Sequence, residues 1–134
     1  MGRQQLLKGV IMAKKLISVV VPVHNELDNI RPLYRKLAQQ ADDLPYVFEF
    51  IFIDDGSTDA SLLALERLAR SDTRIQVLEF ARNFGKEIAL TAGLHEAKGK
   101  AAIMIDADLQ HPPELIKDFI KKIPDEKKRK DALV

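Results

Sequence analysis

Two aspartates, Asp106 and Asp108, stand one residue apart directly after an apolar run, residues 101–105, that has the composition of a buried strand. If the chain is still extended there, both side chains point the same way, because alternate residues of a strand share a face. Like charges this close repel unless a positive group lies between them. Hard oxygen ligands suit Mg²⁺ or Mn²⁺. The pair predicts a metal site at a strand end, although acidic residues also gather in turns and helix caps.

The elements that would position this pair alternate along the chain. Short β-branched or apolar runs predict strands at 16–23, 48–53, 75–80 and 101–105. Helical periodicity predicts helices at about 28–41, 60–70, 86–97 and 113–123. Four strand–helix units in succession imply an α/β fold with a parallel sheet and right-handed crossovers.

Each predicted helix has apolar residues to bury. The expected inward positions are Ile30, Leu33, Leu37 and Ala41 in the first helix, Leu62, Leu63, Leu65, Leu68 and Ala69 in the second, and Leu115, Ile116, Phe119, Ile120 and Ile123 in the last. Ser57 or Asp59 is expected to cap the second helix, and Gly56 allows a sharp turn before it.

Three polar clusters follow predicted strands. They are 24–26, 54–57 and 106–110. In an open parallel sheet, ligands bind beyond the carboxyl ends of the strands, which lie at one edge. Capping residues alone would not need to gather there, so the three clusters together predict a ligand site at this edge.

Composition excludes several classes of function. The chain has 134 residues, enough for one domain, with 21 basic and 20 acidic residues and a net charge of +1. This balance argues against a nucleic-acid partner held by bulk charge. Cysteine is absent, so disulfides and thiolate metal sites are excluded. No apolar run approaches the ~18 residues of a membrane span.

The chain divides into three expected parts. Residues 1–15 are expected to be an N-terminal extension, and Met12, just before the first strand, would be a natural start. Residues 16–123 form the expected domain, and residues 124–134 a charged, solvated tail.

The polar clusters and their flanking residues resemble family 2 glycosyltransferases, which have the GT-A fold. The resemblance covers about residues 16–123 and is carried by ordered motifs: Val21 to Glu26, Ile53 to Asp59, Arg82 to Lys86, Ala92 to Leu94 and Asp106 to Glu114. Within the family, Asp106 to Glu114 most resembles the polyprenyl-phosphate branch, which includes dolichyl-phosphate mannose synthases and undecaprenyl-phosphate glycosyltransferases. The expected fold is then the Rossmann-like nucleotide-binding half of GT-A.

The resemblance implies a role for each matching position. Pro22, His24 and Glu26 should line a nucleotide pocket, Ile53 and Asp55 should meet the base, and Asp106 and Ala107 should lie along the ribose. Asp108 and Gln110 should ligate Mg²⁺ or Mn²⁺, which holds the donor diphosphate, so that Asp106 and Asp108 are the expected catalytic residues.

The resemblance also implies partners. The donor would be a UDP- or GDP-sugar, the acceptor in full-length relatives a lipid phosphate, and the location cytoplasmic, at the inner face of the membrane. The family's domain normally continues past the length of this chain, which suggests a truncated product with an exposed apolar face that favours self-association or a missing second half.

Alternatives stay open at several positions. A nucleotide-binding or interaction module without catalysis is the main alternative function. A phosphohydrolase is weakly suggested by Ile53 to Thr58, and a dinucleotide-binding domain is disfavoured because no Gly-x-Gly-x-x-Gly follows a strand. Lys86 either approaches a phosphate at a helix start or is a solvated loop lysine. Asp54 is expected to be a turn residue, and His95 and His111 surface and loop residues.

Overall fold

The computed structural model describes residues 15–108 and 115–122. The strands are β1 (Leu16–Val23), β2 (Val47–Asp54), β3 (Ile75–Glu79) and β4 (Ala101–Met104), and the helices are α2 (Leu27–Asp43), α3 (Ser61–Ser71), α4 (Lys86–Glu96) and α5 (Leu115–Lys121). Every predicted strand and helix is present, with ends within about two residues of the prediction. The α/β class is confirmed.

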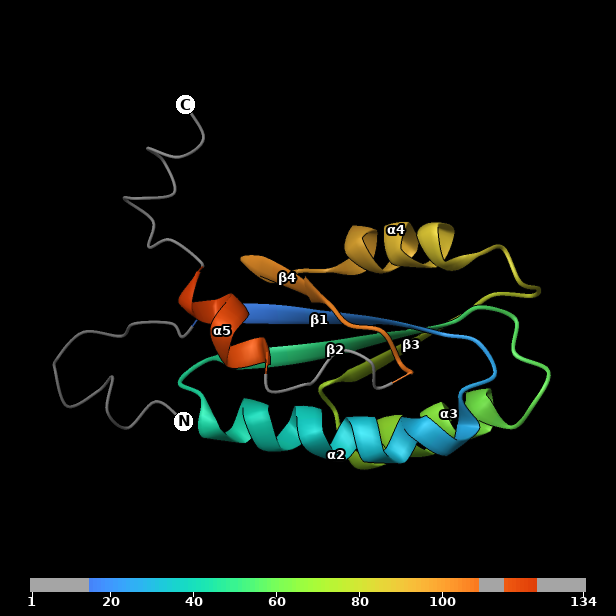
Figure 1. Cartoon of the computed structure of the whole chain (residues 1–134), viewed down its shortest axis with the longest axis horizontal. Helices are drawn as coiled ribbons and strands as arrows, with labels where there is room; N and C mark the ends of the chain where they lie inside the picture. Colours follow the sequence, from blue (N-terminus) through green and yellow to red (C-terminus); the bar gives the residue numbers. More distant parts are fainter. Residues whose placement is uncertain (1–14, 109–114, 123–134) are drawn as a thin grey trace, which may run out of the picture.

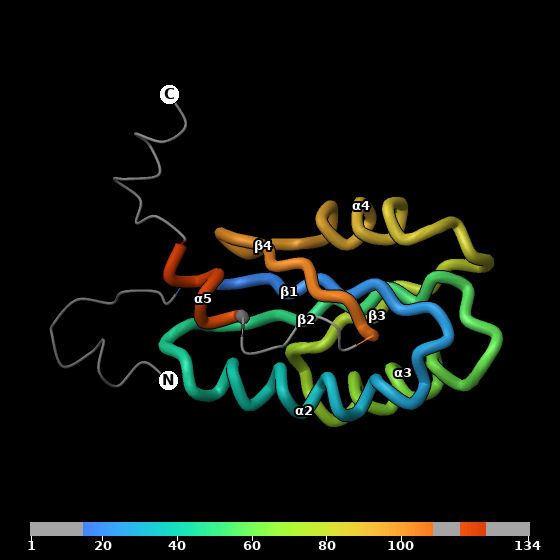
Figure 2. Tube along the Cα trace, viewed as in Figure 1, coloured from blue at the N-terminus to red at the C-terminus, as the bar shows by residue number. Residues whose placement is uncertain are grey.

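The four strands form one parallel sheet in the order β3-β2-β1-β4. The chain builds the sheet outward from β1 to β3 and then crosses to the other side of β1 to add β4 (Figure 1). The strand order therefore reverses between β1 and β4, which is where open α/β sheets bind ligands. Figure 2 shows the connections that follow β1, β2 and β3 gathered at one end of the sheet.

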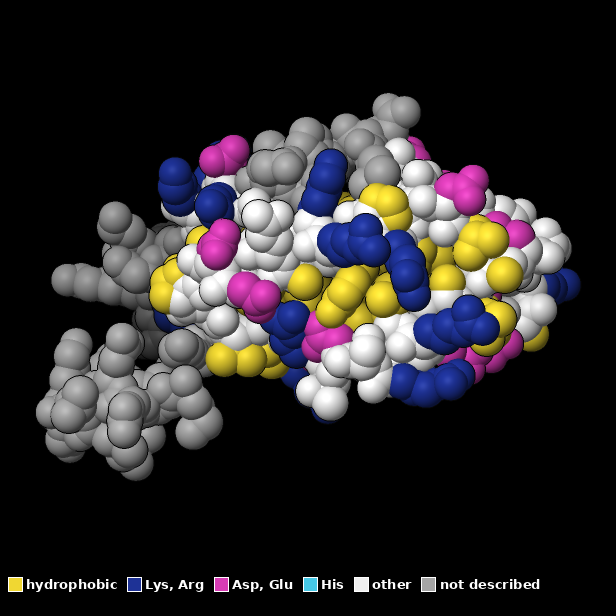
Figure 3. Space-filling model, turned by 90° about the horizontal axis from the view of Figure 1, so that it is seen from below, with side chains coloured by type: hydrophobic (Ala, Val, Ile, Leu, Met, Phe, Trp, Pro, Cys, Tyr) yellow, Lys and Arg dark blue, Asp and Glu magenta, His cyan; other side chains and the backbone are white. Residues whose placement is uncertain are grey.

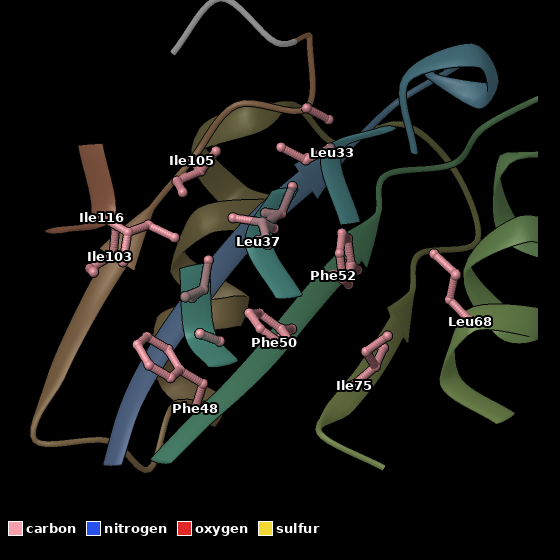
Figure 4. Packing of buried hydrophobic residues seen from close by; sticks show 14 of the residues in the cluster. Leu33, Leu37, Phe48, Phe50, Phe52, Leu68, Ile75, Ile103, Ile105 and Ile116 are labelled. Atoms are coloured by element: carbon pink, nitrogen blue, oxygen red, sulfur yellow. The ribbon is translucent and has the colours of Figure 1, made fainter. Parts of the chain in front are cut away.

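Helices cover both faces of the sheet. Helices α2 and α3 lie on one face and α4 on the other (Figure 1). Strand alternation explains which side chains each face buries, because Val19 and Phe50 point toward α2 and α3 whereas Val20 and Ile51 point toward α4. Figure 4 shows the larger cluster, in which Phe48, Phe50 and Phe52 of β2 lie with helix residues such as Leu33 and Leu37.

The predicted helix stripes are partly confirmed. Ile30, Leu33, Leu37 and Ala41 of α2 are all buried, as are Leu65 and Leu68 of α3 and Ile116 and Ile120 of α5.

Two predicted inward positions are wrong. Leu63 is 45% exposed and Phe119 is 43% exposed. Helix α3 contacts the sheet along Ser61, Leu65 and Leu68, and Leu63 lies on the opposite side of that stripe. Figure 3, a view from the side of α2 and α3, shows apolar side chains exposed among Lys and Arg on this face.

A buried hydroxyl fixes the approach to β4. The Ser18 hydroxyl donates to Oε2 of Glu49 at 2.5 Å and accepts the backbone N–H of Gly99 at 2.9 Å. Oε2 of Glu49 also accepts the backbone N–H of Lys98 at 2.7 Å. A Cβ on Gly99 would lie 2.6 Å from the Ser18 hydroxyl oxygen, so this close approach requires glycine. The network ties the α4–β4 connection to β1 and β2.

In the part of the chain that the structure describes, no helix has the length and apolarity to cross a bilayer.

Candidate functional site

A cavity of about 340 Å³ opens at the carboxyl edge of the sheet, where the strand order reverses. The ends of β1 and β2, the segment after β4 and the start of α4 all contribute to it. Its lining residues are Pro22, Val23, His24, Glu26, Asp55, Asn83, Gly85, Lys86, Asp106, Ala107 and Asp108.

Most of the predicted site residues meet at this cavity. Those that line it are Pro22, His24, Glu26, Asp55, Asp106, Ala107 and Asp108. Ile53 does not line it, because its side chain is fully buried beneath α4, close to Gly93. Gln110, like His111, lies outside the described residues.

Asp106 and Asp108 both line the cavity, but they do not lie on an extended strand, so the expectation based on strand alternation is wrong. Strand β4 ends at Met104, and Ala107 and Asp108 lie in a turn. Ala107 is 4% exposed and packs with the larger core cluster, so the turn is anchored between the two carboxylates. Anchoring of this turn, and not strand alternation, brings Asp106 and Asp108 to one site.

His24 is held by hydrogen bonds on both ring nitrogens. Nδ1 lies 2.9 Å from the backbone carbonyl oxygen of Asp55, and Nε2 lies 3.0 Å from Nδ2 of Asn83. Since a carbonyl oxygen only accepts, Nδ1 carries the proton, and Nε2 accepts from the Asn83 amide. The ring therefore links the end of β1 to the segments after β2 and β3, in one fixed orientation.

Asp55 organises the loop before α4. Its carboxylate accepts the backbone N–H of Phe84 at 2.7 Å and that of Gly85 at 3.0 Å. The side chain is 3% exposed, so both bonds are shielded from water. Gly85 has φ = 104°, a conformation that favours glycine, and α4 begins at the next residue. Asp55 thus positions the N-terminus of α4 at the cavity.

Asn25 ties together the loops that follow β1 and β2. Its backbone has φ = 52°, a left-handed conformation that asparagine tolerates. Oδ1 accepts the backbone N–H groups of Thr58 at 2.8 Å and Asp59 at 3.3 Å, and the Asn25 N–H donates to the Ser57 hydroxyl at 2.9 Å. Of the two residues expected to cap α3, Ser57 instead joins the loops after β1 and β2. Asp59 accepts the backbone N–H of Ser61, the first residue of α3.

Gly56 allows the loops after β2 and β3 to touch. Its φ is 66°, and an added Cβ would lie 2.2 Å from the carbonyl carbon of Arg82 and 2.3 Å from the nitrogen of Asn83. Backbone contact this close is possible only without a side chain. Gly56 therefore sets the position of Asn83, which in turn bonds His24.

Lys86 and Asp106 form an ion pair at the cavity. The Lys86 side chain is 58% exposed and that of Asp106 is 23% exposed, so the pair is accessible to solvent. A lysine at the first residue of α4 adds its charge to the positive end of the helix dipole. The cavity therefore brings together carboxylate oxygens, an ammonium group and a helix N-terminus.

The carboxylates at the cavity fit a divalent cation that is coordinated partly by the protein and partly by a substrate. Mg²⁺ is typically held by one or two carboxylates with water and substrate phosphates. Asp106 and Asp108 supply carboxylates at one cavity. Among the described residues no group of three or more His, Cys, Asp or Glu side chains could hold a metal alone. The site suits a cation that arrives with a phosphate.

Sequence reasoning gave no role to Asn83 or Gly85, and the structure places both on the cavity. Asn83 contacts His24 across 59 positions of sequence, which no local pattern could indicate. Gly85 stands just before a predicted helix, where a glycine after a loop could have been interpreted as a sharp turn.

A second cavity of about 480 Å³ lies on the other side of His24 and Asn83. Asp54, at the end of β2, is one of its lining residues. This side chain is 2% exposed, and its Oδ1 has no hydrogen-bond partner in the described residues. Asp54 is therefore the last residue of β2, and it does not line the first cavity.

The amino-acid sequence matches a known protein family and several curated proteins. The glycosyl transferase family 2 model matches residues 18–129. A prophage bactoprenol glucosyl transferase homolog of Escherichia coli K12 is 49% identical over 107 residues, which are 79% of this chain and 35% of that protein.

Two solved structures share the fold. Staphylococcus aureus TarS 1–349, in complex with UDP-GlcNAc, has a TM-score of 0.66 at 30% identity, covering 82% of this chain and 30% of TarS. The mannosyltransferase PcManGT of Pyrobaculum calidifontis, in complex with GDP-Man and Mn²⁺, has a TM-score of 0.65 at 25% identity, covering 86% and 34%. The chain spans about a third of the length of the curated relatives it matches.

Proposed function

The chain belongs to glycosyl transferase family 2, and on this premise we propose that its carboxyl-edge cavity binds a nucleotide-sugar donor whose sugar is transferred to a polyprenyl phosphate. The observation that supports donor binding is the convergence of seven predicted residues, from three separate parts of the chain, on one cavity. This cavity lies at the switch point of the sheet, where α/β folds bind nucleotides.

The base and ribose would lie against the residues that end β1 and β2. Pro22, His24 and Glu26 line the cavity and would contact the nucleoside. The fixed orientation of the His24 ring supports a role as a flat surface for the base, because both its nitrogens are already bonded. Asp55 would contribute through the loop it holds, with accepting capacity left on its carboxylate. Ile53 would pack beneath the residues that contact the nucleoside.

The diphosphate would lie between α4 and residues 106–108, which we call the aspartate turn. Lys86 and the N-terminus of α4 offer positive charge at the cavity. Asp106 and Ala107 would lie along the ribose, and Asp108, with Gln110, would hold a Mg²⁺ or Mn²⁺ ion together with the donor phosphates. When bound, such an ion supplies positive charge that stabilises the leaving nucleoside diphosphate.

A polyprenyl phosphate is the proposed acceptor. Sequence relatives named as bactoprenol glucosyl transferases support this class of acceptor. A phosphate oxygen is already anionic, so its attack on the sugar carbon needs no strong general base. A lipid acceptor would also place the reaction at a membrane surface, and the inner face is the location we propose.

The experiment that tests this function separates donor binding from transfer. Binding of UDP-GlcNAc, UDP-glucose and GDP-mannose is measured with Mg²⁺, and transfer of labelled sugar to bactoprenyl phosphate is then assayed with the donor that binds. Binding with transfer would support the whole proposal. Binding without transfer would favour a nucleotide-binding module, and no binding by a folded sample would overturn the proposal.

A further inference from the structure

Asp54 and Glu79 are two carboxylates that lie side by side at the end of the sheet. They are the last residues of β2 and β3, and the parallel pairing sets them directly opposite one another. Both point to the face covered by α2 and α3, because they alternate with Ile53 and Leu78, which pack on the other face. Neighbouring strands lie about 4.8 Å apart, so these two negative charges repel unless a positive group lies between them.

Three backbone N–H groups of the segment that follows β2 bond to other side chains than Asp54. Those of Thr58 and Asp59 both donate to Asn25. That of Ser61 donates to the Asp59 carboxylate. The Asp54 side chain is 2% exposed, and its Oδ1 has no hydrogen-bond partner among the described residues. A buried carboxylate oxygen without a donor is costly, so Asp54 marks a place where a bound group could donate.

Arg82 brings a positive charge to the second cavity, which Asp54 and Glu79 also line. Its guanidinium lies over the ring of Phe84, with the guanidinium carbon 4.8 Å from the ring centroid. Among the described residues, neither Asp54 nor Glu79 forms an ion pair. The two carboxylates therefore lack a cationic partner within the part of the chain that the structure describes, and a bound cation could take that place.

The second cavity suits an organic cation better than a metal ion alone. A Ca²⁺ ion needs more oxygen ligands than two carboxylates provide, and among the described residues no group of three or more His, Cys, Asp or Glu side chains could hold a metal. The volume of about 480 Å³ lies in the range of cavities that bind organic ligands. Leu62, Phe80 and Ala81 line it with apolar groups, and an aromatic ring also attracts a cation to its face.

We propose that the second cavity binds a small primary alkylamine in its ammonium form. The ammonium group has three N–H donors and would lie between Asp54 and Glu79, with the Thr58 hydroxyl oxygen as a further acceptor. The alkyl chain would pack against Leu62 and Phe80. This proposal adds a binding site to the chain and does not depend on the proposed donor site.

Titration with n-butylammonium chloride tests the proposal. Amide chemical shifts of the isotope-labelled chain are followed at constant ionic strength. Saturable shifts are expected in the two segments that contribute most to the second cavity, residues 54–58 and 79–83. Tetramethylammonium carries the same charge but has no N–H group, so it should bind at least about fivefold more weakly. n-Butanol has the same alkyl chain without the charge, and it should also bind at least about fivefold more weakly.

Variants locate the bound ammonium group. Asp54→Asn and Glu79→Gln should each weaken n-butylammonium binding by about fivefold or more, because each replaces a charged acceptor with a neutral one. Glu79 is exposed, so its variant keeps the test valid if Asp54→Asn does not fold. Glu66→Gln removes an exposed carboxylate of α3 and should leave binding unchanged.

Several outcomes would overturn the proposal. They are the absence of saturable shifts at the second cavity, equal binding of tetramethylammonium, and an equal loss in Glu66→Gln. Binding seen only in Arg82→Gln would overturn it too, because Arg82 would then be the cation that neutralises Asp54 and Glu79 in solution. None of these readouts involves a nucleotide, so failure here leaves the proposed donor site untouched.

Discussion

Lys86 and Asp106 form an ion pair that joins the first residue of α4 to the segment after β4. The lysine thus places positive charge where a cation bound to the aspartate turn would also lie. Lysine and cation would repel one another, whereas a diphosphate would attract both. In the proposed donor site the positive charge of Lys86 and that of the cation would therefore lie on either side of the Asp106 carboxylate.

Removing this lysine should tighten the binding of a cation alone. In Lys86→Met, the affinity for Mn²⁺ should rise about threefold or more, because one like charge near a partly exposed carboxylate is lost. Titration with MnCl₂, followed by the electron paramagnetic resonance of free Mn²⁺, measures the change. The exposed Lys117→Met is the matched control. Unchanged or weaker binding in Lys86→Met would show that Lys86 does not sense the cation.

Gly56 provides a test of how the loops form the cavity. Gly56→Ala should lower the free energy of unfolding by about 2–4 kcal/mol. The added Cβ would clash with backbone atoms of Arg82 and Asn83, and the alanine would also have to adopt a positive φ. Gly85→Ala is the control, since its φ of 104° is also positive but no atom lies within 4 Å of the added Cβ. Urea unfolding compares them. A loss of only about 1 kcal/mol in Gly56→Ala, which is the cost of a left-handed backbone alone, would contradict the role of backbone contact.

Asn25 makes separable contributions through its side chain and its backbone. Asn25→Gly removes the bonds to Thr58 and Asp59 but tolerates φ = 52°, and should cost about 1–2 kcal/mol of unfolding free energy. Asn25→Ala should cost about 1 kcal/mol more, because it also strains the backbone. Chemical denaturation of both variants checks the order. A glycine variant less stable than the alanine variant would contradict this account.

Asp72 should make stability depend on pH in the acid range. The guanidinium of Arg74 donates to both oxygens of the Asp72 carboxylate, from Nη2 at 2.8 Å and from Nε at 3.0 and 3.2 Å, and with the Tyr34 hydroxyl it lowers the pKa of Asp72 from 3.8 to about 2. A lowered folded-state pKa means that this stabilisation is present above about pH 4 and is lost as the pH falls toward 2. Its size is about 1–2 kcal/mol.

Asp72→Asn should therefore be less stable than the wild type near neutral pH, and the difference should vanish toward about pH 2. Urea unfolding across this range measures it. Glu66→Gln, an exposed substitution on α3, is the control. A stability difference that stays constant with pH would exclude the Asp72 ionisation as its origin.

The sequence predicted the sheet, and seven of the residues expected at a ligand site line one cavity, whereas their roles there stay a prediction. Apolar runs located the strands, and parallel connection put the polar clusters at one edge. Contacts between distant segments were not predictable, as with His24 and Asn83. The burial of Ile53 beneath α4 also depends on tertiary packing, since Gly93 of that helix lies against it. The exposure of Phe119 depends on what packs beside β4, which helical periodicity does not show.

The most direct test of the donor site is calorimetric binding of UDP with Mg²⁺ and with a chelator. The comparison uses the wild type, Asp108→Asn in the cavity and Asp118→Asn on α5. We predict Mg²⁺-dependent binding in the wild type and in Asp118→Asn, weakened about tenfold or more in Asp108→Asn. Binding that is equal with chelator, or equal in the two variants, would contradict a metal-assisted donor site at the aspartate turn.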